Sequence, residues 1–310
     1  MTPEGKMRLL LLGQYPLDDK DFGGVYSHLK QLADYLKKYP DIEVHVVTLS
    51  TRIDKDMEVS EGGVSIHYLS SRLPRLIASL GLDQRKIIKK VNEIKPDLIH
   101  AHMTSPVYGF PTTFISGKYK ILLTVHGLVS EESKTWHGLK GRIKAILYRP
   151  MEDYTLRHMR DIIVITEYVK EKISKKTSAK IRVIPLGVSE DYFKAEGKEK
   201  PNQLLFVGGI EPRKGLHHLL AAIKDVLKKH PNTELRIVGS IRKKEYYDQL
   251  ADYVKTKNLN KSVYFTGSKN KEELLSEYGE CSVFVLPSQE ESEGLVLLEA
   301  MASGKPVVAS

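Results

Sequence analysis

The stretch that decides the fold is VLPSQEESEGLVLLEAMASGKPVVAS, residues 285–310. It opens at the end of an apolar run, residues 283–286, that is typical of a buried strand, and it closes on a second such run at residues 306–309. Between the two runs, Glu291 lies in a loop, Gly294 precedes an apolar helical segment, and Glu299 follows about one and a half turns into that segment. Strand, helix and strand in this order predict a parallel β-α-β unit.

The same alternation continues over the rest of the chain. Residues 25–39 and 216–229 have apolar positions at helical spacing, and several apolar runs lack the alternation of a half-exposed strand, as parallel strands covered on both faces do. The predicted strands are residues 8–12, 44–49, 64–69, 97–101, 121–125, 162–166 and 181–185, then 204–207, 235–238, 263–265, 283–286 and 306–309. We therefore predict an α/β protein with two Rossmann-like, doubly wound parallel-sheet domains facing a cleft. The polar stretch 191–202 is the expected linker between an N-terminal domain, 1–190, and a C-terminal domain, 203–310.

Composition narrows the class of protein and of partner. A length of 310 residues fits two domains, and the single cysteine, Cys281, excludes an internal disulfide. The apolar run near the start is too short for a membrane span and no cleavage site follows it, so we expect a cytoplasmic protein. A net charge of +9 favours an anionic partner, although a plain lysine-rich surface would give the same value.

The basic charge leaves two macromolecular partners to weigh. No basic strand with interleaved aromatic residues is present, so we expect no nucleic-acid binding. Residues 72–82 and 136–148 mix cations with apolar residues, as helices at a membrane surface do. The alternative is that both are helices packed on the first domain's sheet. Peripheral association with an anionic membrane, at its inner face, is therefore an expectation that liposome flotation would test.

Clusters of glycine and charge follow several predicted strands, where open α/β sheets bind ligands. Gly23 and Gly24 precede the first helix, and paired glycines allow close approach of an anion to a helix N-terminus. Arg213 and Lys214 lie just before a helix, where cations are unfavourable unless an anion binds there. We infer a pyrophosphate group as that anion, because arginine binds phosphate in a bidentate manner and lysine adds a point charge.

Two further groups of side chains suit a nucleotide-sugar ligand. Glu291 and Glu299 flank the start of the last helix, whose free amides at Gly294, Leu295 and Val296 would face a diphosphate. A carboxylate accepts two hydrogen bonds from a vicinal diol, as in a sugar or a ribose. His126 ends a buried strand and is a candidate for either a structural or a functional role. His100 and His102 share a strand face, but no third ligand is evident, so we expect no metal.

In combination these motifs resemble the retaining glycosyltransferases of the GT-B fold, family four. The resemblance is carried by Pro287-Ser288, Glu291, seven intervening residues, Glu299, and the sequence AMASGKPVVAS that follows. The GGV at residues 23–25, DLIHAH at 97–102, TVH at 124–126, RKG at 213–215 and FTGSKNKEEL at 265–274 occur in the family's order. The resemblance implies an enzyme of class EC 2.4 that needs no cofactor and takes a nucleotide sugar as its donor substrate.

The resemblance also implies roles for individual residues. Lys214, helped by Arg213 and by the amides after Glu293, would neutralise the leaving diphosphate. Glu291 would hold hydroxyls of the donor sugar, Glu299 the ribose diol, and Gly267, Ser268 and Lys269 would lie at the base. His126 would face the anomeric carbon. The acceptor hydroxyl would attack on the side from which the diphosphate leaves, so the configuration would be retained without bound magnesium.

Departures from the family pattern raise separate questions. Gly209 stands where an arginine is usual, so we expect Arg213 to compensate and Arg213→Ala to lower activity almost as much as Lys214→Ala. Glu293 stands where phenylalanine is common, and we expect its side chain to turn to solvent. The Asp18–Asp21 segment contains the D-x-D of the other glycosyltransferase fold, but we interpret it as a polar turn.

The resembling enzymes continue past residue 310 and end in a helix that returns to the first domain. We therefore expect an incomplete donor domain, with weakened closure and stability. Two alternatives to the transferase stay open: a GT-B-like sugar-nucleotide epimerase, and a non-catalytic protein that binds membrane surfaces through its basic charge. The donor base, the donor sugar and the acceptor are chosen by loops whose sequence does not identify them.

Overall fold

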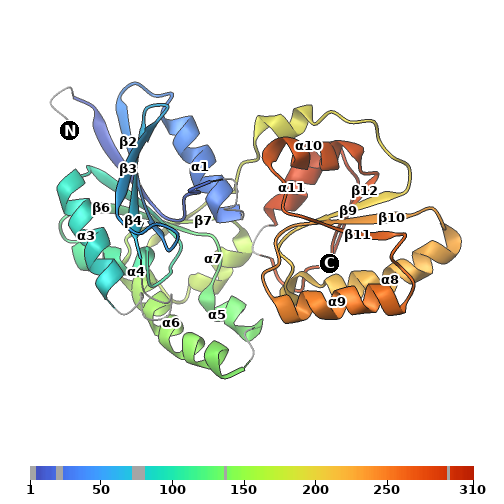
Figure 1. Cartoon of the computed structure of the whole chain (residues 1–310). Coiled ribbons are helices and arrows are strands. Elements are labelled where there is room, and N and C mark those ends of the chain that lie inside the picture. The colour runs from blue at the N-terminus through green and yellow to red at the C-terminus, as the bar shows by residue number, and fades with distance from the viewer. Residues whose placement is uncertain (1–4, 19–23, 72–80, 136–137, 292–293) are drawn as a thin grey trace. The chain divides into compact units, whose positions relative to one another are not determined.

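The computed structural model describes residues 5–18, 24–71, 81–135, 138–291 and 294–310. Its chain divides into two compact units, one running to Leu186 and the other consisting of Gly187–Ser310 with Gly24 grouped alongside it. Each unit is an α/β layer structure with its own sheet and core (Figure 1). Within the described residues, no helix is both long enough and apolar enough to cross a bilayer.

The first unit contains an eight-stranded sheet in the order β3-β4-β2-β1-β5-β6-β7-β8. Every neighbouring pair is parallel except β3 and β4, which are antiparallel. The strands are β1 (Met7–Leu12), β2 (Ile42–Ser50), β3 (Met57–Glu61), β4 (Val64–Ser70), β5 (Leu98–His102), β6 (Lys120–Val125), β7 (Asp161–Val164) and β8 (Lys180–Val183).

Helices cover both faces of this sheet. On β1, Leu9 and Leu11 belong to one buried cluster and Leu10 and Leu12 to another, because successive side chains of a strand point to opposite faces. This explains why β1 is apolar without alternation. The helices are α1 (Gly24–Leu36), α3 (Leu82–Ile94), α4 (Gly109–Thr112), α5 (Val129–Glu132), α6 (Gly138–His158) and α7 (Glu167–Ile173), with short 3-10 turns at Thr113–Ile115 and Ser133–Thr135.

The second unit has a five-stranded, all-parallel sheet in the order β11-β10-β9-β12-β13. Figure 1 shows α8 and α9 on one face of it and α10 and α11 on the other. The elements are β9 (Gln203–Val207), α8 (Leu216–Lys229), β10 (Glu234–Val238), α9 (Lys244–Thr256), β11 (Val263–Gly267), α10 (Lys271–Glu280), β12 (Val283–Leu286), α11 (Leu295–Ala302) and β13 (Val307–Ala309), with 3-10 turns η3 (Glu190–Lys194) and η4 (Pro212–Lys214).

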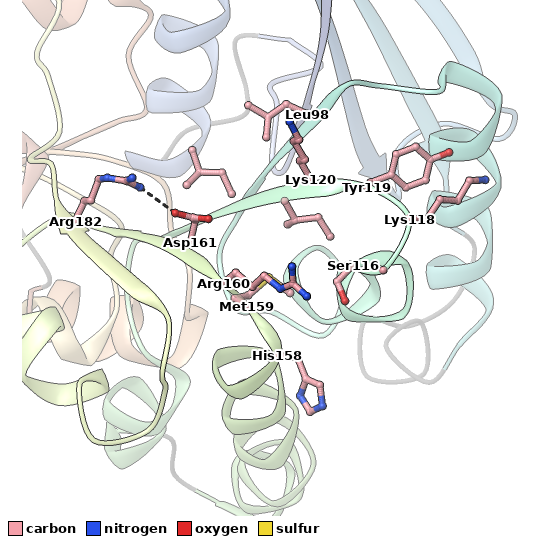
Figure 2. A pocket seen from close by; sticks show the side chains of 13 residues that line it. Leu98, Ser116, Lys118, Tyr119, Lys120, His158, Met159, Arg160, Asp161 and Arg182 are labelled. Atoms are coloured by element: carbon pink, nitrogen blue, oxygen red, sulfur yellow. Dashed lines mark hydrogen bonds and ion pairs between the residues drawn. The ribbon is translucent and has the colours of Figure 1, made fainter.

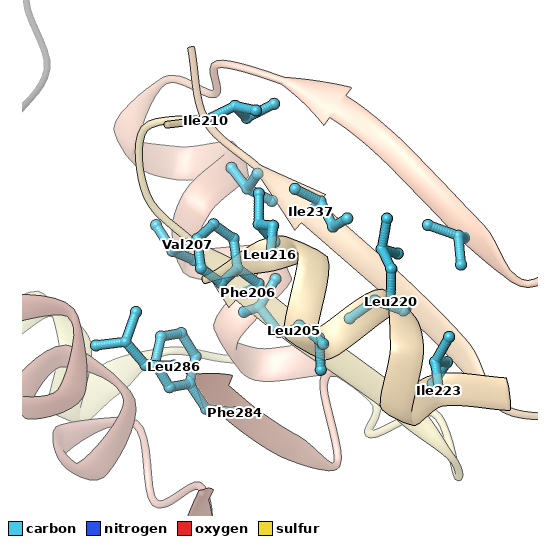
Figure 3. Packing of buried hydrophobic residues seen from close by; sticks show 14 of the residues in the cluster. Leu205, Phe206, Val207, Ile210, Leu216, Leu220, Ile223, Ile237, Phe284 and Leu286 are labelled. Carbon is cyan, nitrogen blue, oxygen red and sulfur yellow. The ribbon is translucent and has the colours of Figure 1, made fainter. Parts of the chain in front are cut away.

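The core of the second unit fixes the two loops that follow β9 and β12. Leu216, Leu220 and Ile223 of α8 lie over the strands at the centre of the sheet (Figure 3). Helix α10 begins at a capping box, in which the Asn270 side chain and Glu273 satisfy each other's backbone amides. The sheet is therefore held from both faces, and the carboxyl ends of its strands are rigid supports for the loops.

The predicted fold class is confirmed: both halves are α/β units built on parallel sheets. The predicted strands recur with ends shifted by one or two residues, and Thr166, expected in a strand, instead caps α7 by accepting a hydrogen bond from the Val169 amide. One strand was missed. β3 has only one partly buried residue, Val59, so it lacks the apolar pattern by which strands are recognised in a sequence.

Candidate active site

An ion pair joins the loops that follow β9 and β12. The Lys214 ammonium binds a carboxylate oxygen of Glu291, and Arg213 Nη1 lies 3.7 Å from the other oxygen. Only 13% of the Lys214 side chain and 22% of the Glu291 side chain are exposed. The chain therefore itself supplies an anion, the Glu291 carboxylate, beside these cations.

Gly215 allows the two loops to approach this closely. Its φ is +67°, and a Cβ at this position would lie 1.9 Å from the Pro287 carbonyl oxygen. The Gln289 amide donates to the Arg213 carbonyl at 2.9 Å, and Arg213 Nη1 donates to the Glu290 carbonyl at 2.7 Å. Any larger residue at 215 would separate Lys214 from Glu291, since the backbone itself would have to move.

The charge state of Glu291 follows from this pairing. Burial acts to raise the pKa of its carboxyl, but Lys214 and Arg213 outweigh burial and hold the pKa below its ordinary value. The carboxylate is thus ionised at neutral pH, and in this form both of its oxygens act only as hydrogen-bond acceptors.

A third cationic side chain, Arg242, approaches the same edge of the sheet. Gly208 and Gly209 follow β9, and a Cβ on Gly208 would lie 3.7 Å from Lys214 Cε. A Cβ on Gly209 would lie 2.8 Å from Arg242 Cγ and 3.4 Å from its Nε. The Arg242 stem therefore occupies the space where a side chain at 209 would begin, and its backbone amide donates to the Ile210 carbonyl.

Glu299 is buried in α11 and is held by tyrosines. Its Oε2 accepts a hydrogen bond of 2.8 Å from the Tyr278 hydroxyl, and Tyr192 provides a second one. Burial raises the pKa of Glu299 to about 7, although the two hydrogen bonds act in the opposite direction. The partners of the Glu299 carboxyl are therefore neutral hydroxyl donors rather than a cation.

The helix start between the two glutamates is shaped by Gly294. This residue has a φ of +72° and is the N-cap of α11 without a side-chain hydrogen bond. The first amides of any helix lack intrahelical acceptors, so those of Leu295 and Val296 are available to a ligand. Glu293, predicted to face solvent, lies outside the described residues.

Gly267, Ser268 and Lys269 connect β11 to α10 at the same edge of the sheet. Gly267 has a φ of +75°, and its carbonyl accepts a hydrogen bond from the Gly239 amide after β10. Lys269 pairs with Glu273 at 3.3 Å. The loops after β9, β10, β11 and β12 thus meet at one end of the second unit's sheet, the end at which α/β sheets bind ligands.

In the first unit, His126 belongs to a cluster of buried imidazoles. It follows β6, and its Nε2 lies 3.0 Å from Nδ1 of His102 at the end of β5. His28 of α1 joins them, and ligand atoms of the three rings lie within 4.8 Å of one another. A third imidazole, that of His28, therefore reaches His102 from α1, although none was evident from the sequence.

These imidazoles are neutral at pH 7. Burial lowers the pKa of His126 to about 3 and that of His28 to about 4, and it also lowers those of His100 and His102. Neutral imidazole is the form that binds metals, so the three clustered rings could hold a transition-metal ion, and the expectation of a metal-free protein stays a prediction.

Of the predicted glycine pair, Gly23 lies outside the described residues and Gly24 begins α1.

The first unit also contains two cavities. One, of about 340 Å³, lies at the carboxyl ends of β1, β2 and β5, where Tyr15, Tyr108, Lys144 and Tyr148 are among its lining residues. The other, of about 550 Å³, lies at the opposite edge, between Lys120, Arg160 and the Arg182–Asp161 ion pair (Figure 2). Ligands of α/β sheets bind at carboxyl ends, so the first cavity is the candidate substrate site.

Comparison with known families agrees with this geometry. The model described as Glycosyltransferase Family 4 matches residues 22–192, and that described as Glycosyl transferases group 1 matches residues 188–310. The chain belongs to glycosyltransferase family 4. It is therefore a glycosyltransferase, with the two matches covering its two α/β units in turn.

Individual relatives of this family 4 glycosyltransferase share its full span at modest identity. An uncharacterized glycosyltransferase of Methanocaldococcus jannaschii is 28% identical over 93% of this chain and 75% of its own length. The sulfoquinovosyl transferase of Arabidopsis thaliana is 26% identical over all of this chain and 61% of its own. Sucrose-phosphate synthase from Thermosynechococcus elongatus superposes with a TM-score of 0.80 at 21% identity, covering 98% of this chain and 81% of the other, which confirms the GT-B fold.

Several residues that the structure places beside the predicted site residues were not predicted from the sequence. Arg242, Tyr278 and Tyr192 belong to none of the motifs identified in the sequence. Their placement depends on packing between segments far apart in the chain, and no local pattern encodes it. The Asp18 side chain, interpreted as part of a polar turn, pairs with Arg52.

Proposed function

We propose that the protein transfers a sugar from a nucleotide-diphosphate-sugar donor to an acceptor hydroxyl, with retention of the anomeric configuration and without a metal ion. The observation that carries the proposal is the Lys214–Glu291 pair, with Arg213 and Arg242 beside it, next to the N-terminus of α11. Cations and helix amides in this arrangement favour a diphosphate group.

Donor binding would exchange the partners of this pair. The diphosphate would take the Lys214 ammonium, and Glu291, released from it, would accept hydrogen bonds from hydroxyls of the donor sugar. Arg242 would supply the cation that Gly209 lacks, because its stem lies where a side chain at 209 would begin. The Arg213 guanidinium, which holds the Glu290 carbonyl and lies 3.3 Å from Glu211, would support the loop that carries Glu291.

The nucleoside would bind along the same edge of the sheet. Glu299, in its ionised form, would accept hydrogen bonds from both ribose hydroxyls, with Tyr278 and Tyr192 fixing the carboxylate's orientation. The segment 267–269 would contact the base, since it follows β11 at the same edge as the diphosphate loops.

In the chemical step, the bond between the anomeric carbon and the diphosphate oxygen breaks as the acceptor oxygen bonds to that carbon on the same face. The acceptor proton passes to the leaving phosphate oxygen, so no protein base is required. Lys214, Arg242 and the α11 amides would stabilise the charge that develops on the leaving group. His126, neutral at pH 7, would orient the donor sugar by hydrogen bonding rather than transfer the proton.

The test is incubation with uridine, guanosine and adenosine diphosphate sugars after treatment with EDTA, followed by NMR. We expect release of the nucleoside diphosphate from one class of donor at an undiminished rate, with the released or transferred sugar first formed in the donor's configuration. Loss of turnover with EDTA would contradict the metal-free mechanism. Conversion of the donor into a different nucleotide sugar, with no sugar transferred or released, would show an epimerase instead.

A further inference from the structure

The first half of α6 exposes a stripe of aliphatic side chains. Leu139, Ile143 and Ile146 are 75%, 40% and 71% exposed, and their spacing places them on one side of the helix. Isolated exposed apolar residues are ordinary, but three in register on one helix face are a candidate interaction surface.

Cations flank this stripe on both sides. At about 100° of rotation per residue, Lys140 lies on one side of the stripe and Arg142 and Arg149 lie on the other. No acidic residue occurs from Gly138 to Arg149. Among the residues that the structure describes, neither Lys140 nor Arg142 has an ion-pair partner. An apolar stripe with cations on both sides is the pattern of a helix that lies in the plane of an anionic bilayer surface.

The opposite side of α6 anchors it to the rest of the unit. Tyr148 is buried, and further along the helix the fully buried Glu152 accepts hydrogen bonds from the Val129 and Ser130 amides and from the Thr104 hydroxyl. The helix is therefore a fixed part of the unit, and its aliphatic stripe is held outward.

The same helix borders the candidate substrate cavity. Lys144 and Tyr148 line the 340 Å³ cavity at the carboxyl ends of the strands, on the side of α6 away from the stripe. A helix is about 10–12 Å across with its side chains, so a group in this cavity would stand roughly that far from a surface touching the stripe.

We propose that α6 docks the protein on an anionic lipid bilayer and that the acceptor is an amphiphile, whose hydroxyl-bearing headgroup enters the adjacent cavity. This rests on the proposed transferase function. A second copy of the chain fits the stripe less well. In a symmetric pair the flanking cations would face one another, and three side chains cover far less than the roughly 800 Å² per partner of a stable interface.

The test is co-sedimentation of the full chain with vesicles of phosphatidylcholine, with and without phosphatidylglycerol. We expect binding only when phosphatidylglycerol is present. Leu139→Ser/Ile146→Ser should lower the partition coefficient by at least about tenfold, since burying one such side chain is worth about that factor or more. Lys140→Gln/Arg142→Gln should lower it by about fivefold for each charge and weaken its dependence on anionic lipid.

Matched controls distinguish vesicle binding through α6 from nonspecific hydrophobic or electrostatic adsorption. Phe114→Ser removes an apolar side chain that is 59% exposed elsewhere on the unit, and Lys120→Gln/Arg160→Gln removes two cations at the cavity of Figure 2. The partition coefficients of both controls should be closer to that of the native chain than those of the α6 variants are. The proposal would be overturned if the controls and the α6 variants lost vesicle binding equally, or if the native chain bound no vesicles. Self-association of the native chain that Leu139→Ser/Ile146→Ser abolishes would also overturn it.

Donor binding gives a separate readout. The α6 variants should bind the nucleotide sugar with unchanged affinity, because the donor loops belong to the second unit. A chain that binds the donor but no vesicle would refute the membrane proposal alone, whereas a chain that binds vesicles but no donor would refute the proposed transferase function.

Discussion

Tyr278→Phe should make donor binding more sensitive to pH. The Tyr278 hydroxyl donates to Glu299 at 2.8 Å, and the ring, fully buried beside Phe284, would keep its packing in phenylalanine. Glu299 has a pKa of about 7, so near neutral pH it is only partly in the ionised form that we propose for binding the ribose hydroxyls. Removing a donor from this carboxylate raises its pKa further.

The size of the effect follows from the energy of one hydrogen bond. A hydrogen bond to a charged group contributes about 1.5–3 kcal/mol, which corresponds to about one or two pKa units. Because Tyr192 keeps its own hydrogen bond to Glu299, we expect a rise of about one unit, to about 8. The ionised fraction at pH 7 would fall about fivefold, and at pH 9 it would hardly change.

The assay is calorimetric titration with a nucleotide sugar between pH 6 and 9. Native affinity should weaken as the pH falls through about 7, and in Tyr278→Phe the same loss should begin about one unit higher. Tyr246→Phe is the control, because its hydroxyl is also buried in the second unit but bonds to His217 instead. A native affinity independent of pH, or a Tyr278→Phe loss that is equal at pH 7 and 9, would refute the reasoning.

Three further predictions concern other parts of the structure. Arg242→Ala should weaken donor binding by about tenfold, and Gly209→Arg should restore it in the Arg242→Ala background but not in the native chain, where the Arg242 stem blocks the site; calorimetry that finds no rescue would point back to Arg213. Gly215→Ala should destabilise the second unit by about 2–4 kcal/mol in urea unfolding and weaken donor binding, because its Cβ would collide with the Pro287 carbonyl; a neutral effect would contradict this. The first unit should lose stability as the pH falls from about 6.5 towards 4, because histidines that are neutral in the fold take up protons on unfolding. Each such histidine lowers the free energy of unfolding by up to about 1.4 kcal/mol per pH unit. Urea unfolding in which this free energy changes with pH by less than the value for one imidazole would contradict the buried cluster of His28, His100, His102 and His126.

The parallel sheets could be predicted because burial on both faces leaves a local mark. Runs such as residues 8–12 and 204–207 are apolar throughout, and the helix expected at residues 216–229 is α8. β3 could not be predicted in this way. It is an exposed edge strand, and its pairing with β4 comes from the Gly62-Gly63 turn between them rather than from an apolar pattern.

For the candidate site as well, residues in a local sequence motif could be predicted, whereas contacts between distant segments could not. Lys214, Glu291 and Glu299 could be predicted as site residues because they lie at motif spacing beside strand ends, and the structure brings Lys214 and Glu291 together. Their relation was not predictable, since it depends on Gly215 packing against the Pro287 carbonyl some seventy residues away. Arg242 and His28 were not predicted for a similar reason: neither lies in a motif, and each reaches its neighbours from a segment distant in the sequence.

The central claim is that the Lys214–Glu291 loops of the second unit bind the diphosphate of a nucleotide sugar. Calorimetric titration of the native chain and of Lys214→Ala with uridine, guanosine and adenosine diphosphate sugars tests it most directly. We predict that one class of donor binds the native chain at one site, and that Lys214→Ala weakens this binding by at least about tenfold, the value of one charged hydrogen bond. Failure of every donor to bind, or equal binding by the native chain and the variant, would contradict the claim.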